Sequence, residues 1–382
     1  MSTKVLVGCG IGCVVALMLA VGAAWFGFGH VMSGALGGLT ANRRPADLEQ
    51  AKVVSGAGRF SKRVVWTDPS LGAITDITMG QLDGKPGSEI GLAGTDGAVL
   101  LTERMGAQQT VQFPGSRSHV DVVDVEGDGV CEFMDRGSWS HDVALFDHSG
   151  KLMWSYGGTD GVDDMSGGDI DGDGRLEFAV GFNGGGGVHL VDSAGRRLWR
   201  RRDGNVWHVE VSDLDGDGTA EIIHSNAGGE MTVRGATGQV IRRSRPPAYF
   251  SDFSLCRWPT QMDRQYALFA EDDTIWLLDE DGKAAAKFGA PSAGTLGEAR
   301  GTVVWLPDKQ HTYLAVLVDL HNYDRAILYL YDRAGKLVYQ EILPESCAAI
   351  AALPLFATRH VLLVGGQGRV IEYQMASGAD KP

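Results

Sequence analysis

The chain has 382 residues, of which 44% are hydrophobic, and it carries a formal net charge of −14. Such an excess of carboxylates disfavours binding to nucleic acid or to anionic lipid headgroups, so we expect no nucleic-acid partner. The five cysteines include no Cys-x-x-Cys pair and no accompanying histidine cluster, which argues against a disulfide framework or a zinc site. The length and the 54 glycines suit a large globular domain with many turns.

The N-terminal segment is strongly apolar. Residues 5–28 contain no charged side chain, and a helix of that length, about 36 Å, crosses the hydrocarbon core of a bilayer. Lys4 precedes this run and aromatic residues close it. We therefore expect residues 1–28 to form a transmembrane signal-anchor helix, with the rest of the chain on the extracytoplasmic side, periplasmic or extracellular. A cleaved signal peptide is the alternative.

Small residues recur at every fourth position of this segment, at Gly8, Gly12, Ala16, Ala20 and Ala24. On a helix they form one smooth stripe, which favours lateral packing against another copy or another membrane subunit. The alternative is that glycine and alanine are simply abundant here. After it we assign residues 29–56 to a linker, 57–377 to one β-domain and 378–382 to a C-terminal tail.

An acidic nine-residue pattern begins at residues 81, 124, 169 and 213. The steps of 43 to 45 residues match the period of a four-stranded propeller blade. Carboxylates at positions 1, 3 and 5 alternate with residues that include two turn glycines, so their oxygens face one concavity. Hard oxygen ligands on a flexible loop suit Ca²⁺ better than Mg²⁺. The alternative is an acidic turn that holds no ion.

The candidate ligands are the carboxylates at positions 1, 3, 5 and 9 and the carbonyl at position 7. In two loops they are Asp169, Asp171, Asp173, Arg175 and Glu177, and Asp213, Asp215, Asp217, Thr219 and Glu221. In a third they are Asp124, Glu126, Asp128, Val130 and Glu132. We predict two or three calcium sites. In the first loop Gln81 replaces a carboxylate and Lys85 stands at position 5, so we expect its ammonium to take the place of the ion.

These loops resemble the FG-GAP/VCBS repeat family of β-propellers, which includes the calcium-binding blades of integrin α-subunits. The resemblance covers four repeats and fades after about residue 245. It implies calcium in the loop between the first and second strands of a blade, and partner binding commonly on the opposite face. It does not imply an enzyme.

A second element extends the repeats to the C-terminal half. An apolar strand, a glycine turn and a short strand recur around Gly150, Gly195, Gly282 and Gly335, which is typical of hairpins. Counting by this element predicts an all-β, seven-bladed β-propeller, with six or eight blades as alternatives. The last blade lacks one strand, and residues 58–66 resemble the missing one. We therefore expect N- and C-terminal strands to close this blade together.

The face opposite the acidic loops is the candidate partner surface, because its predicted connections carry aromatic and hydrogen-bonding side chains. The residues are His119, Trp139, His141, Asn183, Trp207, His208, Tyr249, Phe250, His321 and Tyr323. The alternative is that each is an ordinary loop or packing residue.

The sequence has no G-x-S-x-G elbow, H-E-x-x-H helix or phosphate-cradling loop. We therefore predict no enzyme, but a membrane-anchored, calcium-binding propeller that is a protein-binding or scaffolding subunit of a membrane or cell-surface assembly. A carbohydrate-binding, lectin-like propeller with a glycan ligand is the main alternative, and a propeller hydrolase or lyase is a further one. The candidate residues differ from blade to blade, which favours a single protein partner.

Overall fold

The computed structural model describes residues 51–137, 140–250, 252–294, 297–305, 311–355 and 359–375. The chain divides into two compact units, Met1–Arg44 and Pro45–Pro382, and all the described residues belong to the second. The predicted transmembrane segment with its small-residue stripe, most of the predicted linker and the predicted tail lie outside the described residues.

Within these described residues, twenty-eight strands form six antiparallel sheets. Three sheets of four strands follow the chain: β3 (Ile74–Gly80), β4 (Glu89–Gly94), β5 (Gly97–Thr102) and β6 (Ala107–Gln112); β14 (Val206–Ser212), β15 (Glu221–Asn226), β16 (Met231–Arg234) and β17 (Val240–Ser244); and β18 (Ser254–Trp258), β19 (Gln261–Glu271), β20 (Thr274–Leu278) and β21 (Ala284–Gly289).

Three sheets depart from this simple order. One has the order β2 (Phe60–Thr67), β28 (Arg369–Met375), β27 (Arg359–Gly365) and β26 (Ala349–Leu355). Another has five strands in the order β1 (Lys52–Ser55), β25 (Leu337–Leu343), β24 (Arg325–Tyr331), β23 (Thr312–Leu320) and β22 (Glu298–Trp305). The last has seven, in the order β13 (Arg197–Arg201), β12 (Gly187–Val191), β11 (Glu177–Phe182), β10 (Leu152–Gly168), β9 (Ser140–Phe146), β8 (Glu132–Asp135) and β7 (Val120–Val123). The described helices are two short 3₁₀ turns, η2 (Pro69–Leu71) and η3 (His321–Tyr323).

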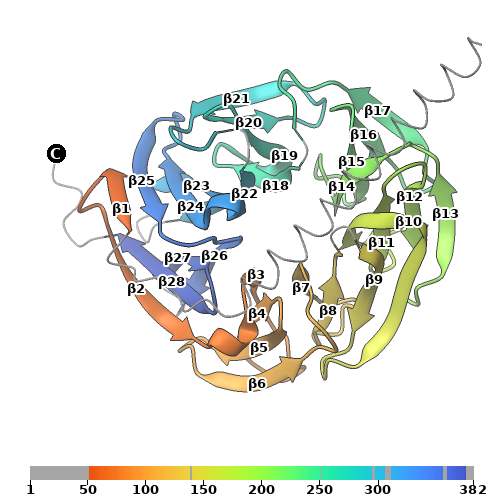
Figure 1. The fold of residues 1–382 in the computed structure, drawn as a ribbon, viewed down its shortest axis with the longest axis horizontal. Coiled ribbons are helices and arrows are strands. Elements are labelled where there is room, and N and C mark those ends of the chain that lie inside the picture. The colour runs from red at the N-terminus through yellow and green to blue at the C-terminus, as the bar shows by residue number, and fades with distance from the viewer. Residues whose placement is uncertain are drawn as a thin grey trace, which may run out of the picture. The chain divides into compact units, whose positions relative to one another are not determined.

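The sheets are arranged in a ring (Figure 1). Contacts between inner strands join β26 to β3, β3 to β7, β10 to β14, β14 to β18, β18 to β22, and β22 back to β26. Strands β6, β13, β17, β21, β25 and β2 lie on the outside. The described residues therefore form an all-β propeller, which confirms that part of the predicted fold class.

The number of separate blades differs from the prediction. The first part of β10, Leu152–Gly157, pairs with β9, whereas Val162–Gly168 pairs with β11. One long strand is thus the outer strand of one group and the inner strand of the next, so that two predicted blades merge into a single sheet. The prediction of seven separate blades is therefore wrong, and the described strands form six sheets.

The two ends of the domain meet in one sheet. β2 pairs with β28 in a register that runs from Phe60 opposite Met375 to Thr67 opposite Arg369. The end of the predicted linker is itself a strand, because Lys52 and Val53 of β1 pair with Ile342 and Glu341 of β25.

The membrane prediction requires a correction. Among the described residues, no helix is long and apolar enough to cross a membrane. The prediction of a single-pass membrane protein with an extracytoplasmic propeller is therefore not supported by the described residues, which form a β-propeller.

Packing between sheets explains the sequence pattern of the strands. Middle strands such as β11 and β23 are buried throughout, because neighbouring sheets cover both of their faces. The outer strand that follows each glycine turn packs on the next hairpin. Trp154 donates its indole N–H to the carbonyl of Ser193, at 2.9 Å, and Gly195 has a φ of 76° with its Cα against the Trp154 ring.

Candidate functional site

The acidic loops follow the inner strands β7, β10 and β14 and have a shared backbone conformation. The carboxylate of Asp169 accepts hydrogen bonds from the N–H groups of Gly172, at 2.7 Å, and Gly174, at 3.0 Å. Asp213 accepts in the same way from Gly216 and Gly218, both at 2.8 Å. The glycines at positions 4 and 6 have positive φ angles, between 79° and 90° in these two loops, so the turn depends on them.

Two of the loops bring their carboxylates close enough to share an ion. Ligand oxygens of Asp169, Asp171 and Glu177 lie within 4.8 Å of one another, and so do those of Asp213, Asp215 and Asp217. Calcium–oxygen distances of about 2.3–2.6 Å place ligands on opposite sides of an ion about 4.6–5.2 Å apart. The side chains of these loops therefore fit calcium. Among the described residues the loop that begins at Asp124 shows no such grouping.

The first loop holds a cation of its own. The Lys85 ammonium lies 3.0 Å from a carboxylate oxygen of Asp83, and the Gln81 amide donates to the Lys85 carbonyl at 2.9 Å. An internal ion pair thus stands where the other loops have a third carboxylate.

The loops also connect neighbouring groups of strands. The N–H of Cys131 donates to the carbonyl of Leu82, and that of Leu176 to the carbonyl of Val125, both at 2.9 Å. Further along, the N–H of Gln265 donates to the Leu214 carbonyl at 3.1 Å. Any ion that orders a loop would therefore also order a contact between neighbouring groups of strands.

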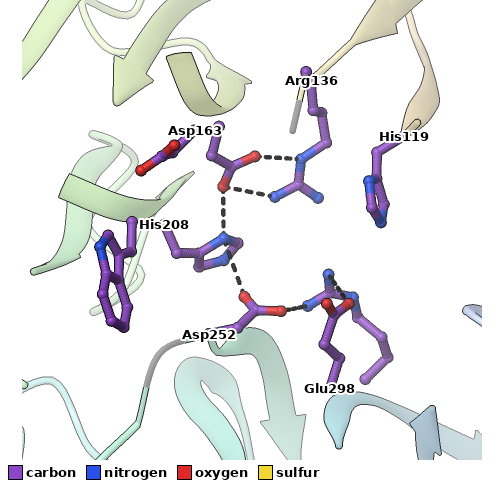
Figure 2. Close-up of a pocket in the computed structure, with 10 residues that line it drawn as sticks. His119, Arg136, Asp163, His208, Asp252 and Glu298 are labelled. Carbon is purple, nitrogen blue, oxygen red and sulfur yellow. Dashed lines mark hydrogen bonds and ion pairs between the residues drawn. The ribbon is translucent and has the colours of Figure 1, made fainter. Parts of the chain in front are cut away.

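A pocket of about 290 Å³ lies at the opposite ends of the inner strands. His119 directly precedes β7, Trp207 and His208 are at the start of β14, and Glu298 begins β22. The acidic loops, in contrast, follow the last residues of their strands. The pocket is lined by His119, Arg136, Gly137, Asp163, Asp164, Trp207, His208, Asp252, Glu298 and Arg300, and Figure 2 shows them converging.

Only some of the predicted partner-surface residues lie at this central pocket. His119, Trp207 and His208 line the pocket, and the amide of Asn183 donates to the carboxylate of Asp163 at 3.2 Å.

The remaining predicted residues are elsewhere. His141, Tyr249, His321 and Tyr323 are exposed outside the pocket lining, and Trp139 lies outside the described residues. The prediction that Phe250 belongs to the partner surface is corrected, because this side chain is only 3% exposed and stacks on Phe269 in the core.

Charged side chains of alternating sign run across the pocket (Figure 2). Arg136 binds Asp164 through two hydrogen bonds of 3.0 and 3.2 Å. The Nδ1 atom of His208 lies 2.5 Å from Asp164 and 3.1 Å from Asp252. Asp252 is 3.3 Å from Arg300, whose guanidinium is 3.9 Å from Glu298. We call Arg136, Asp164, His208, Asp252, Arg300 and Glu298 the central charge chain.

Burial and these contacts set the pKa values. Burial alone lowers the pKa of His208, but the carboxylates of Asp252 and Asp164 outweigh it and raise the value to about 10. Burial raises the pKa of Asp164, yet Arg136 and His208 bring it well below its ordinary range. Burial raises the pKa of Asp163 to about 6, although the bond from Asn183 opposes this. Burial lowers the pKa of His119, which favours its neutral form.

Sequence reasoning missed Arg136, Asp163, Asp164, Asp252, Glu298 and Arg300. One signal was present. Asp76, His119, Asp164 and His208 each stand five residues before the start of an acidic loop, in an inner strand or directly before it. A polar residue repeated at one position of the inner strand indicates a side chain that faces the centre of the ring.

The sequence matches no protein-family model and no curated protein. Two crystal structures of BBS1N in complex with ARL6DN, soaked with mercury and with lead, have TM-scores of 0.57 and 0.58, each at 12% identity. The alignments cover 83% and 82% of this chain and 99% and 98% of those chains. BamB from Moraxella catarrhalis has a TM-score of 0.48 at 14% identity, with 87% of this chain and 96% of BamB covered. The likeness to the BBS1N chains shows a shared fold.

Proposed function

We propose that this chain is a calcium-binding β-propeller, related to the FG-GAP/VCBS repeats, that acts as a protein-binding scaffold. Its partner would be recognised by the face that holds the central pocket. The observation that carries this proposal is the convergence of His119, which directly precedes β7, with Trp207 and His208 of β14 in one pocket.

The pocket has properties that suit a side chain of a partner protein. Its volume of about 290 Å³ is slightly below the 300 to 1,000 Å³ typical of small-molecule sites. Trp207 is half-buried, so its ring offers an aromatic surface with a hydrogen-bonding edge. The charged residues mostly bind one another, which leaves few groups for acid–base chemistry and favours recognition over catalysis. BBS1N, which shares the fold, was crystallised with a protein, ARL6DN.

Calcium would serve the scaffold by holding the acidic loops in shape. The carboxylates of Asp169, Asp171 and Glu177 repel one another when ionised, and a divalent cation would remove this repulsion. Because the same loops form hydrogen bonds between neighbouring groups of strands, filled loops would stabilise the ring as a whole.

Affinity capture with matched variants tests the proposal. The full chain, its Trp207→Ala variant and a Met153→Ala control would each be used to capture proteins from the native lysate after cross-linking, with mass-spectrometric quantification. Met153 is 43% exposed on β10, away from the pocket. We expect a partner that the control retains and that Trp207→Ala loses by about tenfold or more, as for an aromatic residue at the centre of an interface.

Two outcomes would count against the proposal. If every captured protein is retained by a folded Trp207→Ala variant, the pocket face is not the recognition surface. If no protein is captured but the chain binds defined oligosaccharides on an array, the lectin-like alternative replaces the protein-binding one.

A further inference from the structure

A concentration of arginine stands out on two outer strands of this acidic chain. Residues 196–202 contain five arginines and residues 242–245 contain three, with no lysine among them, in a protein whose net charge is −14. We call these two segments the arginine stripe. Arginine, unlike lysine, presents a planar fork of donors that matches a carboxylate bidentately.

The two segments lie side by side. The indole of Trp199 in β13 donates to the carbonyl of Ala236 at 2.8 Å, and Arg201 donates to the carbonyl of Gly238 at 3.1 Å. Residues 236–238 form the turn that leads into β17. Figure 1 shows β13 and β17 next to each other on the outer rim.

The stripe has more cations than nearby carboxylates can neutralise. Arg196 pairs with Asp192, and Arg243 lies 3.7 Å from Asp203 and 3.8 Å from Glu230. The exposed arginines at 197, 202 and 245 form no ion pair with the part of the chain that the structure describes. A positive excess is therefore available to a partner.

A cavity of about 300 Å³ adjoins the stripe. Its polar lining includes Asn205, Asn226 and Arg245, together with Asp203 and Glu230. Asp203 pairs with Arg234 and also lies 3.7 Å from Arg243, which is 3.8 Å from Glu230, so both carboxylates already have arginine partners. Arg245 and the amides are the groups left to bind an incoming acidic side chain.

The backbone of β13 offers a second kind of contact. Within the described residues β13 is the last strand of its sheet and pairs with β12 alone, so one edge of its ladder is open. The same ring shows that an outer edge accepts a further strand, because β1 adds antiparallel to β25. An alternative is that the charged residues on this edge strand have the sole role of preventing aggregation. Leu198 argues against it, because this apolar side chain is 54% exposed in the middle of β13 and would itself favour association.

We propose that the arginine stripe and the open edge of β13 bind an extended acidic segment of a partner protein, which adds to the sheet as a strand. Its carboxylates would pair with the arginines that lack carboxylate partners, and its backbone would pair with β13. A short acidic segment fits better than nucleic acid or an anionic membrane, because the net charge of −14 repels a long polyanion. This site is separate from the central pocket, and it does not depend on the function proposed above.

Fluorescence anisotropy with a defined probe tests this inference. The probe is a labelled decapeptide of alternating glutamate and threonine, compared with the same peptide N-methylated at every residue, so that neither edge of its backbone can donate hydrogen bonds. The test variant of the full chain carries Arg197→Glu, Arg202→Glu and Arg245→Glu. A control variant with the same change in net charge carries Arg59→Glu, Arg104→Glu and Arg257→Glu, three exposed arginines on other strands or loops.

We expect the probe to bind the wild-type chain, more weakly as salt increases, with a Kd raised about tenfold or more by the test variant and far less by the control. N-methylation should abolish binding, because it removes the donors that pair with the β13 edge. Equal losses in the two variants, undiminished binding of the N-methylated peptide, or no binding of the probe would each overturn the proposal. If an oligonucleotide or anionic vesicles bind the chain more tightly than the acidic peptide does, the ligand of the stripe is another polyanion and not an acidic protein segment.

Discussion

Replacement of His208 by glutamine should be among the most destabilising substitutions in this protein. Its buried ring lies between the carboxylates of Asp164 and Asp252, at 2.5 and 3.1 Å from Nδ1, and Nε2 lies 3.4 Å from Glu210. The protonated ring neutralises carboxylates that come from separate strands or loops around the centre. Glutamine keeps hydrogen-bonding groups but removes the charge, so that Asp164 and Asp252 would face each other without a cation between them.

The size of the effect follows from the pKa. A rise from the ordinary 6.5 to about 10 corresponds, at about 1.4 kcal/mol per pH unit, to about 5 kcal/mol. Breaking a buried ion pair by removing one partner costs about 3 to 5 kcal/mol, which agrees. Because the folded-state pKa is raised, this contribution is complete below pH 6.5 and is lost as the pH rises through about 10.

Urea unfolding followed by tryptophan fluorescence at a series of pH values measures this contribution. At pH 7 the variant should have an unfolding free energy lower by about 3 to 5 kcal/mol, and the gap should close as the pH approaches 10. His141→Gln is the control, because His141 is exposed and should show neither effect. A His208→Gln variant as stable as wild type at pH 7, or a gap that persists unchanged at high pH, would refute the reasoning.

Two further predictions concern the loops and turns. Chelation of calcium should lower the melting temperature by several degrees, because each site filled at tenfold to hundredfold its Kd adds about 1.4 to 2.7 kcal/mol to the free energy of unfolding. The Asp171→Ala and Asp215→Ala variants should each lose part of that response. Identical melting temperatures in calcium and in chelator would contradict this prediction. Gly195→Ala should destabilise by about 1 to 3 kcal/mol in thermal unfolding, because φ is 76° and a Cβ would lie 2.8 Å from the Trp154 ring. Gly204→Ala, with φ at 79° but nothing within 4 Å of a Cβ, should cost less, and an equal cost would show that the Trp154 contact is unimportant.

The propeller could be predicted because its signals are local and repeated. The step of 43 to 45 residues between acidic loops reflects one group of four strands. The glycine turns at positions such as Gly150 and Gly195 have positive φ angles in the structure, so the residue type reports the backbone directly. Closure by β2 could also be anticipated, since residues 58–66 carry the pattern of an outer strand.

The continuity of β10 could not be predicted in the same way. Residues 157–161 read Gly-Gly-Thr-Asp-Gly, which is typical of a turn. In the structure the strand continues through them, with an irregular register between Gly157 and Val162. Tertiary pairing with β9 on one side and β11 on the other overrides the local preference, because each half of the strand completes a different group.

The central charge chain could be anticipated only in part, for a related reason. Its members are separated by up to 164 residues, from Arg136 to Arg300, and they meet only because the ring closes. No local pattern indicates that His208 has both Asp164 and Asp252 as neighbours. For Phe250 the error was to assign a core residue to the surface, because an aromatic residue in a loop is equally compatible with the exposed surface and with the core.

The inner strand β14 contributes to a different feature of the molecule at each of its two ends. His208 at one end belongs to the charge chain, and five residues later Asp213 begins a loop that fits calcium. Five residues of extended strand span about 16 Å. Unit charges at that distance interact by about 1 kcal/mol at an effective dielectric constant of about 20, and salt screens buried charges much less than exposed ones. An ion in the loop would therefore act on the pocket in two ways, directly through its charge and indirectly by keeping the hydrogen-bonded inner strand in place.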